Sequence, residues 1–192
     1  MTRSACAALF GALALATGLA ACSSPDPALY TIAPAAGAAR IAGLGVILLD
    51  RVDIPRYLDR SQIVKSSEDY RLDVKSNDWW GEPLAPMLRR ILRQELSQRL
   101  PQSTILSETG AVSALPDATI DLDVLRLDED TNGNVVLQAQ VSLTLKGRKV
   151  PVVRSFQYKV PSTAPTSAGE VAAISTAVGQ LADGLTVMLA ER

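Results

Sequence analysis

The sequence contains no histidine, two cysteines and few aromatic side chains, which make up 4% of its 192 residues. The missing histidine excludes Ser-His-Asp and Cys-His catalysis and metal sites built on imidazole. The chain also lacks the G-x-S-x-G motif of hydrolases and the P-loop that cradles phosphates. Because no other catalytic constellation is present, we predict that the protein is not an enzyme.

The start of the chain predicts where the protein works. Arg3 is followed by an apolar run from Ala5 to Ala16, which is shorter than the roughly 20 residues that a membrane-spanning helix needs. A charged start, an apolar middle and a small-residue end are typical of an export signal that is removed, here residues 1–21. The alternative is an ordinary secretory peptide in which Cys22 stands by chance.

Leu19-Ala20-Ala21-Cys22 resembles a bacterial lipobox. This resemblance implies that Cys22 carries a diacylglycerol on sulfur and an acyl chain on its new amino terminus. Cys6 is then lost with the signal, so no disulfide can form and a hydrophobic core must stabilise the domain. Ser23 stands where enterobacterial inner-membrane lipoproteins carry aspartate, which implies the periplasmic face of the outer membrane. We expect a tether over 22–28 and one domain over 29–192.

The charge of the chain argues against nucleic acid as a partner. Removal of Arg3 takes the formal net charge from −1 to about −2, whereas nucleic-acid-binding domains carry a basic surface. We expect no cofactor other than the covalent lipid on Cys22.

Hydrophobic periodicity predicts eight strands. The run 44–49 is continuously apolar and is expected to be buried on both faces. Segments 62–65 and 70–75 could pair as a hairpin, and three later alternating segments predict an antiparallel meander. The expected strands are 30–32, 44–49, 62–65, 70–75, 104–106, 120–124, 137–145 and 156–160.

Two helices complete the predicted fold. Apolar residues at helical spacing predict a helix over 82–100, with Pro83 and Pro86 in its first turn. A second helix is expected over 167–190, opened by a capping box of Ser167 and Glu170. We therefore predict a single α/β domain with a mixed, mainly antiparallel sheet and two main helices packed on it.

Two motifs resemble ligand sites without completing them. Residues 128–134 match the opening of an EF-hand loop, but Ala139 stands where a bidentate glutamate is required. A hairpin turn is favoured there by Asn132-Gly133, and weak calcium binding stays open. The G-x-G of 43–45 lacks its third glycine and is interpreted as the entry to a strand. We expect no metal site.

Three segments together resemble a known family. They are "LYTI" at 29–32, "VDIPRYLDRSQIV" at 52–64 and "WWGEPLAPMLRRILRQELSQRL" at 79–100, all after a lipobox. In order and spacing they resemble the ABC-type transport auxiliary lipoproteins (PqiC/YmbA-like). The resemblance implies a non-catalytic lipoprotein that docks an MCE-domain protein at the outer membrane, in a lipid transport system with an associated inner-membrane transporter.

The resemblance also supplies candidate partner-binding residues. For the five candidates in the loop 55–60 a structural role is an equal alternative, since Arg60 could pair with Asp59 or another carboxylate while Tyr57 and Leu58 pack on the core. At least one of the two tryptophans is expected in the core or at the helix start. The candidates are Pro55, Tyr57, Leu58, Asp59, Arg60, Trp79 and Trp80.

Other functions remain open at this point. A periplasmic lipid-binding carrier lipoprotein would need an apolar cavity, which the low aromatic content disfavours, and an envelope-assembly lipoprotein is a third possibility. A homo-oligomer is also an option, because Asp128, Glu129 and Asp130 and the basic residues of 146–149 stand near opposite ends of one strand. Such charges could join copies head to tail into a ring, but two soluble hairpins are the favoured interpretation, because exposed ion pairs are weak.

Overall fold

The computed structural model describes residues 25–68, 70–107 and 115–191. The predicted signal and Cys22 lie outside these residues, so the removal of 1–21 and the lipidation of Cys22 stay predictions.

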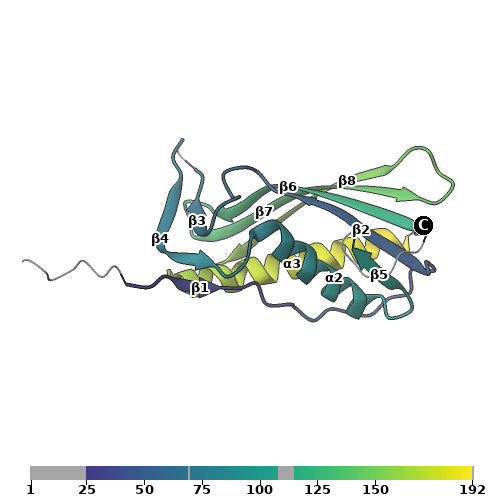
Figure 1. Ribbon diagram of the computed structural model, residues 1–192, viewed down its shortest axis with the longest axis horizontal. Helices are drawn as coiled ribbons and strands as arrows, with labels where there is room; N and C mark the ends of the chain where they lie inside the picture. The colour runs from purple at the N-terminus through teal and green to yellow at the C-terminus, as the bar shows by residue number, and fades with distance from the viewer. Residues whose placement is uncertain (1–24, 69, 108–114, 192) are drawn as a thin grey trace, which may run out of the picture.

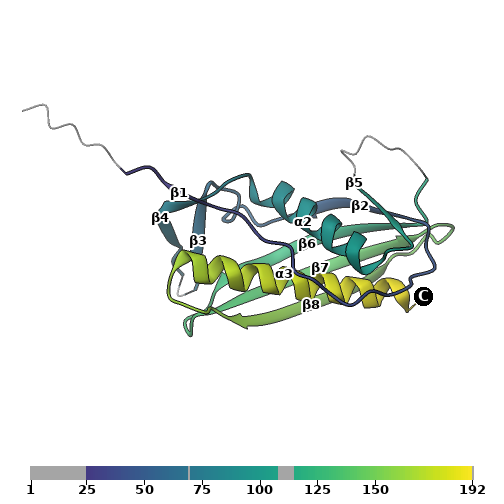
Figure 2. The same ribbon diagram turned by 90° about the horizontal axis from the view of Figure 1, so that it is seen from below.

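The described chain forms one eight-stranded mixed sheet with two helices packed on one of its faces (Figures 1 and 2). This architecture confirms the predicted α/β domain. The elements are β1 (Ala28–Tyr30), β2 (Val46–Asp53), β3 (Gln62–Ser66), β4 (Asp73–Trp80), α2 (Leu84–Arg99), β5 (Thr104–Ser107), β6 (Ala118–Glu129), β7 (Asn134–Leu145), β8 (Val152–Pro161) and α3 (Ser167–Ala190).

Strand β6 organises the sheet. One of its edges pairs with β7 in antiparallel fashion, and β7 pairs in the same way with β8, which confirms the predicted meander. The other edge pairs in parallel with β2 and, at its far end, with β3. The predicted β3–β4 hairpin is also present, but β4 runs on to Trp80 and takes in both tryptophans.

The prediction that the strand at 44–49 is buried on both faces is wrong. Ile47 and Leu49 are fully buried, whereas Val46 and Leu48 are only half-buried. Helices α2 and α3 cover one face of the sheet only, so the alternate residues of β2 lie on the open face. The same face carries the exposed ion pair between Arg51 and Asp121.

Helix α2 begins and ends close to the predicted positions. Pro83 is its N-cap and Pro86 stands within its first turn, where the amide hydrogen that proline lacks is not needed. The apolar stripe faces the sheet and α3. Its predicted members are buried, with exposed fractions of 2% or less: Leu84, Leu88, Ile91, Leu92 and Leu96.

The capping box predicted for α3 is wrong. Thr166 is the N-cap, and its hydroxyl oxygen accepts a hydrogen bond from the Gly169 amide at 3.2 Å. The Ser167 hydroxyl instead donates to the Asp78 carboxylate of β4, and Glu170 turns into the protein, where it is 1% exposed. These tertiary contacts outweigh the local capping pattern.

Helix α3 is long and apolar enough to cross a membrane by length and composition alone. It is 67% buried within the protein over its most apolar window, as the core helix of a folded domain is. Helix α3 packs tightly at Gly179, where an added Cβ would lie 2.6 Å from the Cβ of Ala35. The N-terminal segment 33–40 therefore runs directly over the helices, as Figure 2 shows.

Candidate partner-binding site

Two of the segments that carry the family resemblance meet at a surface hollow of ≈ 330 Å³. One is the loop 54–61 between β2 and β3, and the other is the connection from β4 to α2. The β3–β4 hairpin brings them together, since the Trp80 amide donates to the Ser61 carbonyl at 2.7 Å. The hollow is lined by Asp59, Arg60, Ser61, Trp80, Gly81, Glu82 and Pro83.

The loop 54–61 is held in a tight turn by its own backbone. The Leu58 amide donates to the Pro55 carbonyl at 2.9 Å, and the Arg60 amide donates to the Leu58 carbonyl at 2.9 Å. The Leu58 side chain is 3% exposed and belongs to the hydrophobic core. Pro55 and Leu58 therefore fix the loop, while Asp59 and Arg60 lie exposed at the hollow.

Tyr57 fastens the same loop to the central strand. Its hydroxyl donates to Asp128 Oδ2 at 2.9 Å, and burial together with this carboxyl raises the pKa of Tyr57 to about 12. Asp128 is fully buried and also accepts from the Ser67 hydroxyl at 2.6 Å and from Arg126 Nε at 2.7 Å. Tyr57 thus contributes to the shape of the site rather than to its accessible surface.

Replacement of Tyr57 by phenylalanine is expected to lower the free energy of unfolding by about 2 kcal/mol, because a buried carboxyl loses one of its donors. Urea unfolding at neutral pH measures the change. Tyr70→Phe is the matched control. The Tyr70 side chain is fully exposed, so removal of its hydroxyl should leave the urea midpoint unchanged. Equal midpoints for the two variants would contradict the assignment.

Asp59 and Arg60 do not pair with each other. No ion pair of either side chain is found among the residues with described positions, and both side chains are exposed. The structural alternative for Arg60, an ion pair with Asp59 or with another carboxylate, is therefore not found within the described part of the chain. The guanidinium and the carboxylate remain available to a partner.

The two tryptophans differ in accessibility. Trp80 is 7% exposed and packs in the core, as expected for one of the two. Trp79 is half-buried, and its indole N–H donates to the Ser76 carbonyl at 3.2 Å. It is the register partner of Leu29 in β1, which is 67% exposed. Trp79 and Leu29 therefore give this edge of the sheet a partly apolar surface.

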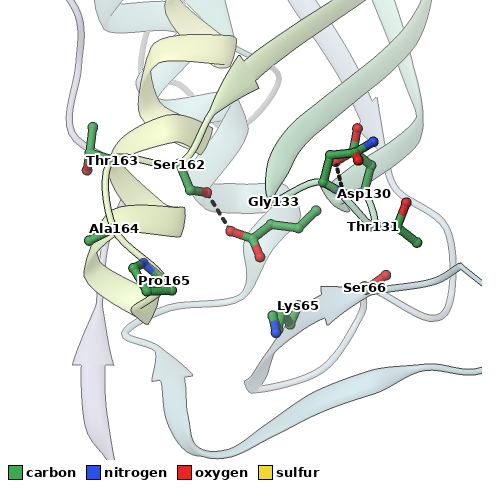
Figure 3. Close-up of a pocket in the computed structure, with 11 residues that line it drawn as sticks. Lys65, Ser66, Asp130, Thr131, Gly133, Ser162, Thr163, Ala164 and Pro165 are labelled. Carbon is green, nitrogen blue, oxygen red and sulfur yellow. Dashed lines mark hydrogen bonds between the residues drawn. The ribbon is translucent and has the colours of Figure 1, made fainter.

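A second polar site, near the start of α3, was missed by sequence reasoning. It lies at a hollow of ≈ 500 Å³ that Lys65, Ser66 and Glu129 help to line, and there the Ser162 hydroxyl donates to Glu129 (Figure 3). Glu170 of α3 interacts electrostatically with Glu129, and its Oε1 is buried without a hydrogen-bond partner among the described residues. Burial, reinforced by the nearby Glu129, raises the pKa of Glu170 to about 8.

The acidic end of the β6–β7 hairpin is not a free charged surface. Asp128 is fully buried and Glu129 is 6% exposed. Asp130 accepts from the Asn132 and Asn134 amides and pairs with Lys159. Burial alone would raise the pKa of Asp130, but the hydrogen bonds from Lys159, Asn134 and Asn132 hold that pKa well below its usual range. The acidic half of the charge pattern that suggested a head-to-tail ring is therefore satisfied within one chain.

The EF-hand-like segment is a hairpin turn. It connects β6 to β7, and Gly133 adopts a φ of 73°, a conformation that favours glycine. Over the residues that the structure describes, no group of three or more His, Cys, Asp or Glu side chains could hold a metal ion.

The fold is that of a single α/β domain in which one mixed sheet carries two helices on one face. The sequence profile described as "ABC-type transport auxiliary lipoprotein component" matches residues 29–185. The chain belongs to this family, which confirms the resemblance seen in the sequence. The family is one of transport-associated lipoproteins, and its description names no enzymatic activity.

Solved structures show the same fold at low identity. A crystal structure of an uncharacterized protein aligns with a TM-score of 0.72 and 18% identity, over 85% of this chain and 99% of that one. Protein XCC0632 from Xanthomonas campestris, of the DUF330 family, aligns with a TM-score of 0.68 and 18% identity, over 84% of this chain and 93% of its own. A search of curated proteins finds no significant match.

Proposed function

We propose that the chain is an outer-membrane lipoprotein subunit of an MCE-type lipid transport system. In this role it docks a periplasmic MCE-domain protein, which an inner-membrane transporter accompanies, and it performs no catalysis. The observation that carries the proposal is the hollow at which Asp59 and Arg60 meet the connection from β4 to α2. Two segments characteristic of a transport family thus share one accessible site.

The chemistry of the hollow suits protein recognition. An arginine guanidinium offers a planar set of five donors, and Arg and Trp are enriched among residues that dominate binding energies. Leu58 and Trp80 hold the two segments in the core, so little ordering should be needed when a partner binds. The exposed Arg60 and the half-buried Trp79 are the side chains that we assign to partner contact.

The position of the hollow also suits a membrane-anchored subunit. The Gly81 amide, in the lining of the hollow, donates to the carbonyl of Tyr30 at 2.8 Å. Strand β1 therefore borders the site, and only a short tether separates β1 from Cys22. Two or three acyl chains on Cys22 would suffice for stable anchoring. The anchor would hold the docked partner close to the outer membrane.

A lipid-carrying function is the second candidate, and it would need an apolar cavity. The hollows beside Arg60, beside Glu129 and on the open face near Asp121 are lined largely by polar or small residues. These surfaces favour docking over carriage.

Gentle purification of the tagged lipoprotein from membranes, with crosslinking and mass spectrometry, tests the proposal. We expect recovery of an MCE-domain protein with transporter components. Arg60→Glu should lower that recovery about tenfold or more, equivalent to a loss of about 1.4 kcal/mol of binding. Arg93→Glu, at an exposed arginine of α2, is the matched control and should leave recovery unchanged.

Each alternative gives a different result in the same experiment. Absence of any MCE-domain protein would contradict the docking function, with co-purified lipid favouring a carrier and an outer-membrane assembly protein favouring envelope assembly. Equal recovery with both variants would contradict the role of the hollow. Light scattering on the same sample tests self-association, and a monomer at all concentrations and at low salt would exclude a homo-oligomer.

A further inference from the structure

The loop between β7 and β8 combines positive charge with exposed aliphatic side chains. We call residues 146–154 the hairpin tip. It contains four basic residues and no acidic one. Val150, Val152 and Val153 are 77%, 43% and 55% exposed. Successive residues of a strand point to opposite faces, so Val152 and Val153 make both faces of the tip apolar. The basic residues are Lys146, Arg148, Lys149 and Arg154.

The hairpin tip projects from the body of the protein. The last β7–β8 register pair joins Leu143 to Val152, and the chain turns beyond it at Gly147, with φ of 80°. Figures 1 and 2 both place the tip at the end of the long axis opposite to β1 and the start of the described chain. The tip therefore lies far from the anchored end.

Two of the four basic side chains at the tip form ion pairs, both weak, and the other two form none. Lys146 lies 4.0 Å from Asp117 and Arg154 lies 3.3 Å from Glu191, both in exposed pairs of little strength. Arg148 and Lys149 form no ion pair within the described chain. A hollow beside Lys146 is lined by 42–44 and Asp117, among others. Two residues close to these in the sequence, Ile41 and Leu115, are exposed and add apolar surface at this end.

We infer that the hairpin tip seats on the anionic phospholipid surface of the membrane that holds the N-terminal anchor. Basic side chains around an exposed apolar element are the pattern of segments that lie in a membrane interface. Lysine is depleted at protein–protein interfaces, and aromatic anchors are enriched there. The tip has two lysines and no aromatic residue, so its chemistry fits a lipid surface better than a protein partner.

The seated tip defines the orientation of the anchored protein. This inference rests on the lipidation of Cys22 that the proposed function includes. Six residue-to-residue steps lead from Cys22 to Ala28, and they can span at most about 20 Å. An anchor at one end and a seated tip at the other make the body lie along the membrane. Both membrane contacts belong to one molecule. Once the anchor is inserted, the tip therefore meets a high effective concentration of lipid surface, and the second contact forms more easily.

A fluorescent label at the tip tests the inference on the full mature lipoprotein. Val150→Cys is labelled with an environment-sensitive dye and reconstituted into phosphatidylcholine vesicles with or without phosphatidylglycerol as about one third of the lipid. The chain contains no other thiol than Cys6, which the signal carries, and Cys22, which is acylated under the proposal. We expect a blue-shifted emission, quenched by nitroxide lipids, in the anionic vesicles only.

Charge variants separate lipid contact from other causes. Arg148→Gln/Lys149→Gln should lower the ratio of seated to unseated molecules by about fivefold per charge removed. Arg56→Gln/Arg93→Gln removes the same charge at exposed positions outside the tip and should have no effect.

Three results would overturn the inference. A label that stays in water in anionic vesicles overturns it directly. A blue shift that grows with protein concentration and ignores phosphatidylglycerol indicates contact between proteins instead. A purified chain without acyl groups counts against the anchor and the seated tip together, whereas an acylated chain with a water-exposed label counts against the tip alone.

Discussion

Replacement of Arg99 by alanine is expected to lower the free energy of unfolding by about 3–5 kcal/mol, the range for breaking a buried ion pair by removing one partner. The Arg99 side chain is 1% exposed at the last turn of α2. Its Nε donates to Asp183 Oδ1 of α3 at 2.6 Å, and its Nη1 donates to the Ala35 carbonyl at 3.0 Å. One guanidinium therefore joins α2, α3 and the N-terminal segment.

The loss is large because several polar groups depend on Arg99. Nη2 also donates to the Gly179 carbonyl at 3.2 Å, and Nη1 lies 3.9 Å from Glu95 Oε2. Burial raises the pKa of Glu95, and the Ala35 amide and Arg99 oppose that rise. Without the arginine, Glu95 keeps its bond to the Ala35 amide but loses its positive neighbour, and buried carbonyls lose their donor.

Urea unfolding measures this effect, and two variants sharpen it. Arg93→Ala removes an exposed arginine from the same helix and should change stability by less than about 0.5 kcal/mol. Arg99→Met keeps most of the side-chain volume but removes the donors, so it separates packing from hydrogen bonding. A loss below about 1 kcal/mol for Arg99→Ala would show that other contacts hold these three segments together.

Arg99 also shows why part of the fold could not be predicted. The apolar alternation of β6, β7 and β8 and the stripe of α2 are local patterns, and the structure confirms them. Arg99 stands on the same helix as exposed arginines, and nothing nearby in the sequence distinguishes it. Its partner Asp183 lies 84 positions further along the chain. Such a contact depends on tertiary packing, which local periodicity does not encode.

The candidate site could be predicted only in part, again because contacts between distant parts of the sequence depend on tertiary packing. The resemblance identified Asp59, Arg60 and Trp80, but only the pairing of β3 with β4 places them around one hollow. Tyr57 received an undecided role, because its partner Asp128 lies 71 positions away. The acidic run 128–130 is interpreted from the sequence as charge at the surface. Asp128 and Glu129 are in fact buried and accept hydrogen bonds from residues distant in the sequence, which a local pattern does not show.

Glu170→Gln is expected to raise the free energy of unfolding at pH 7 by up to about 3 kcal/mol. Glu170 is 1% exposed, and its pKa is raised from 4.5 to about 8, mainly by burial. Among the charged groups around it, Glu129 and Asp128 of β6 also raise the pKa of Glu170, whereas Lys75 of β4 and Lys65 of β3 lower it. The folded protein therefore holds a proton at pH 7 that the unfolded chain releases, which costs about 1.4 kcal/mol per unit of the difference.

The sign of the pH dependence follows from that proton. Below about pH 4.5 both states carry it, so the glutamate costs nothing. Between pH 4.5 and about 8 only the folded state binds it, and the stability of the wild-type protein should fall as the pH rises. Above about pH 8 both states release it and this contribution levels off. A glutamine has no proton to lose, so the variant should lack this slope.

Urea midpoints of wild type and Glu170→Gln across this pH range test the prediction, with Glu191→Gln at an exposed carboxylate as the control. Two curves that meet near pH 4.5 and separate progressively up to about pH 8 are expected. Parallel curves would mean that Glu170 is ionised in the folded protein and paired with Lys65 or Lys75. The start of α3 would then be held by an ion pair instead of a neutral buried acid, because an unpaired charge there would be too costly.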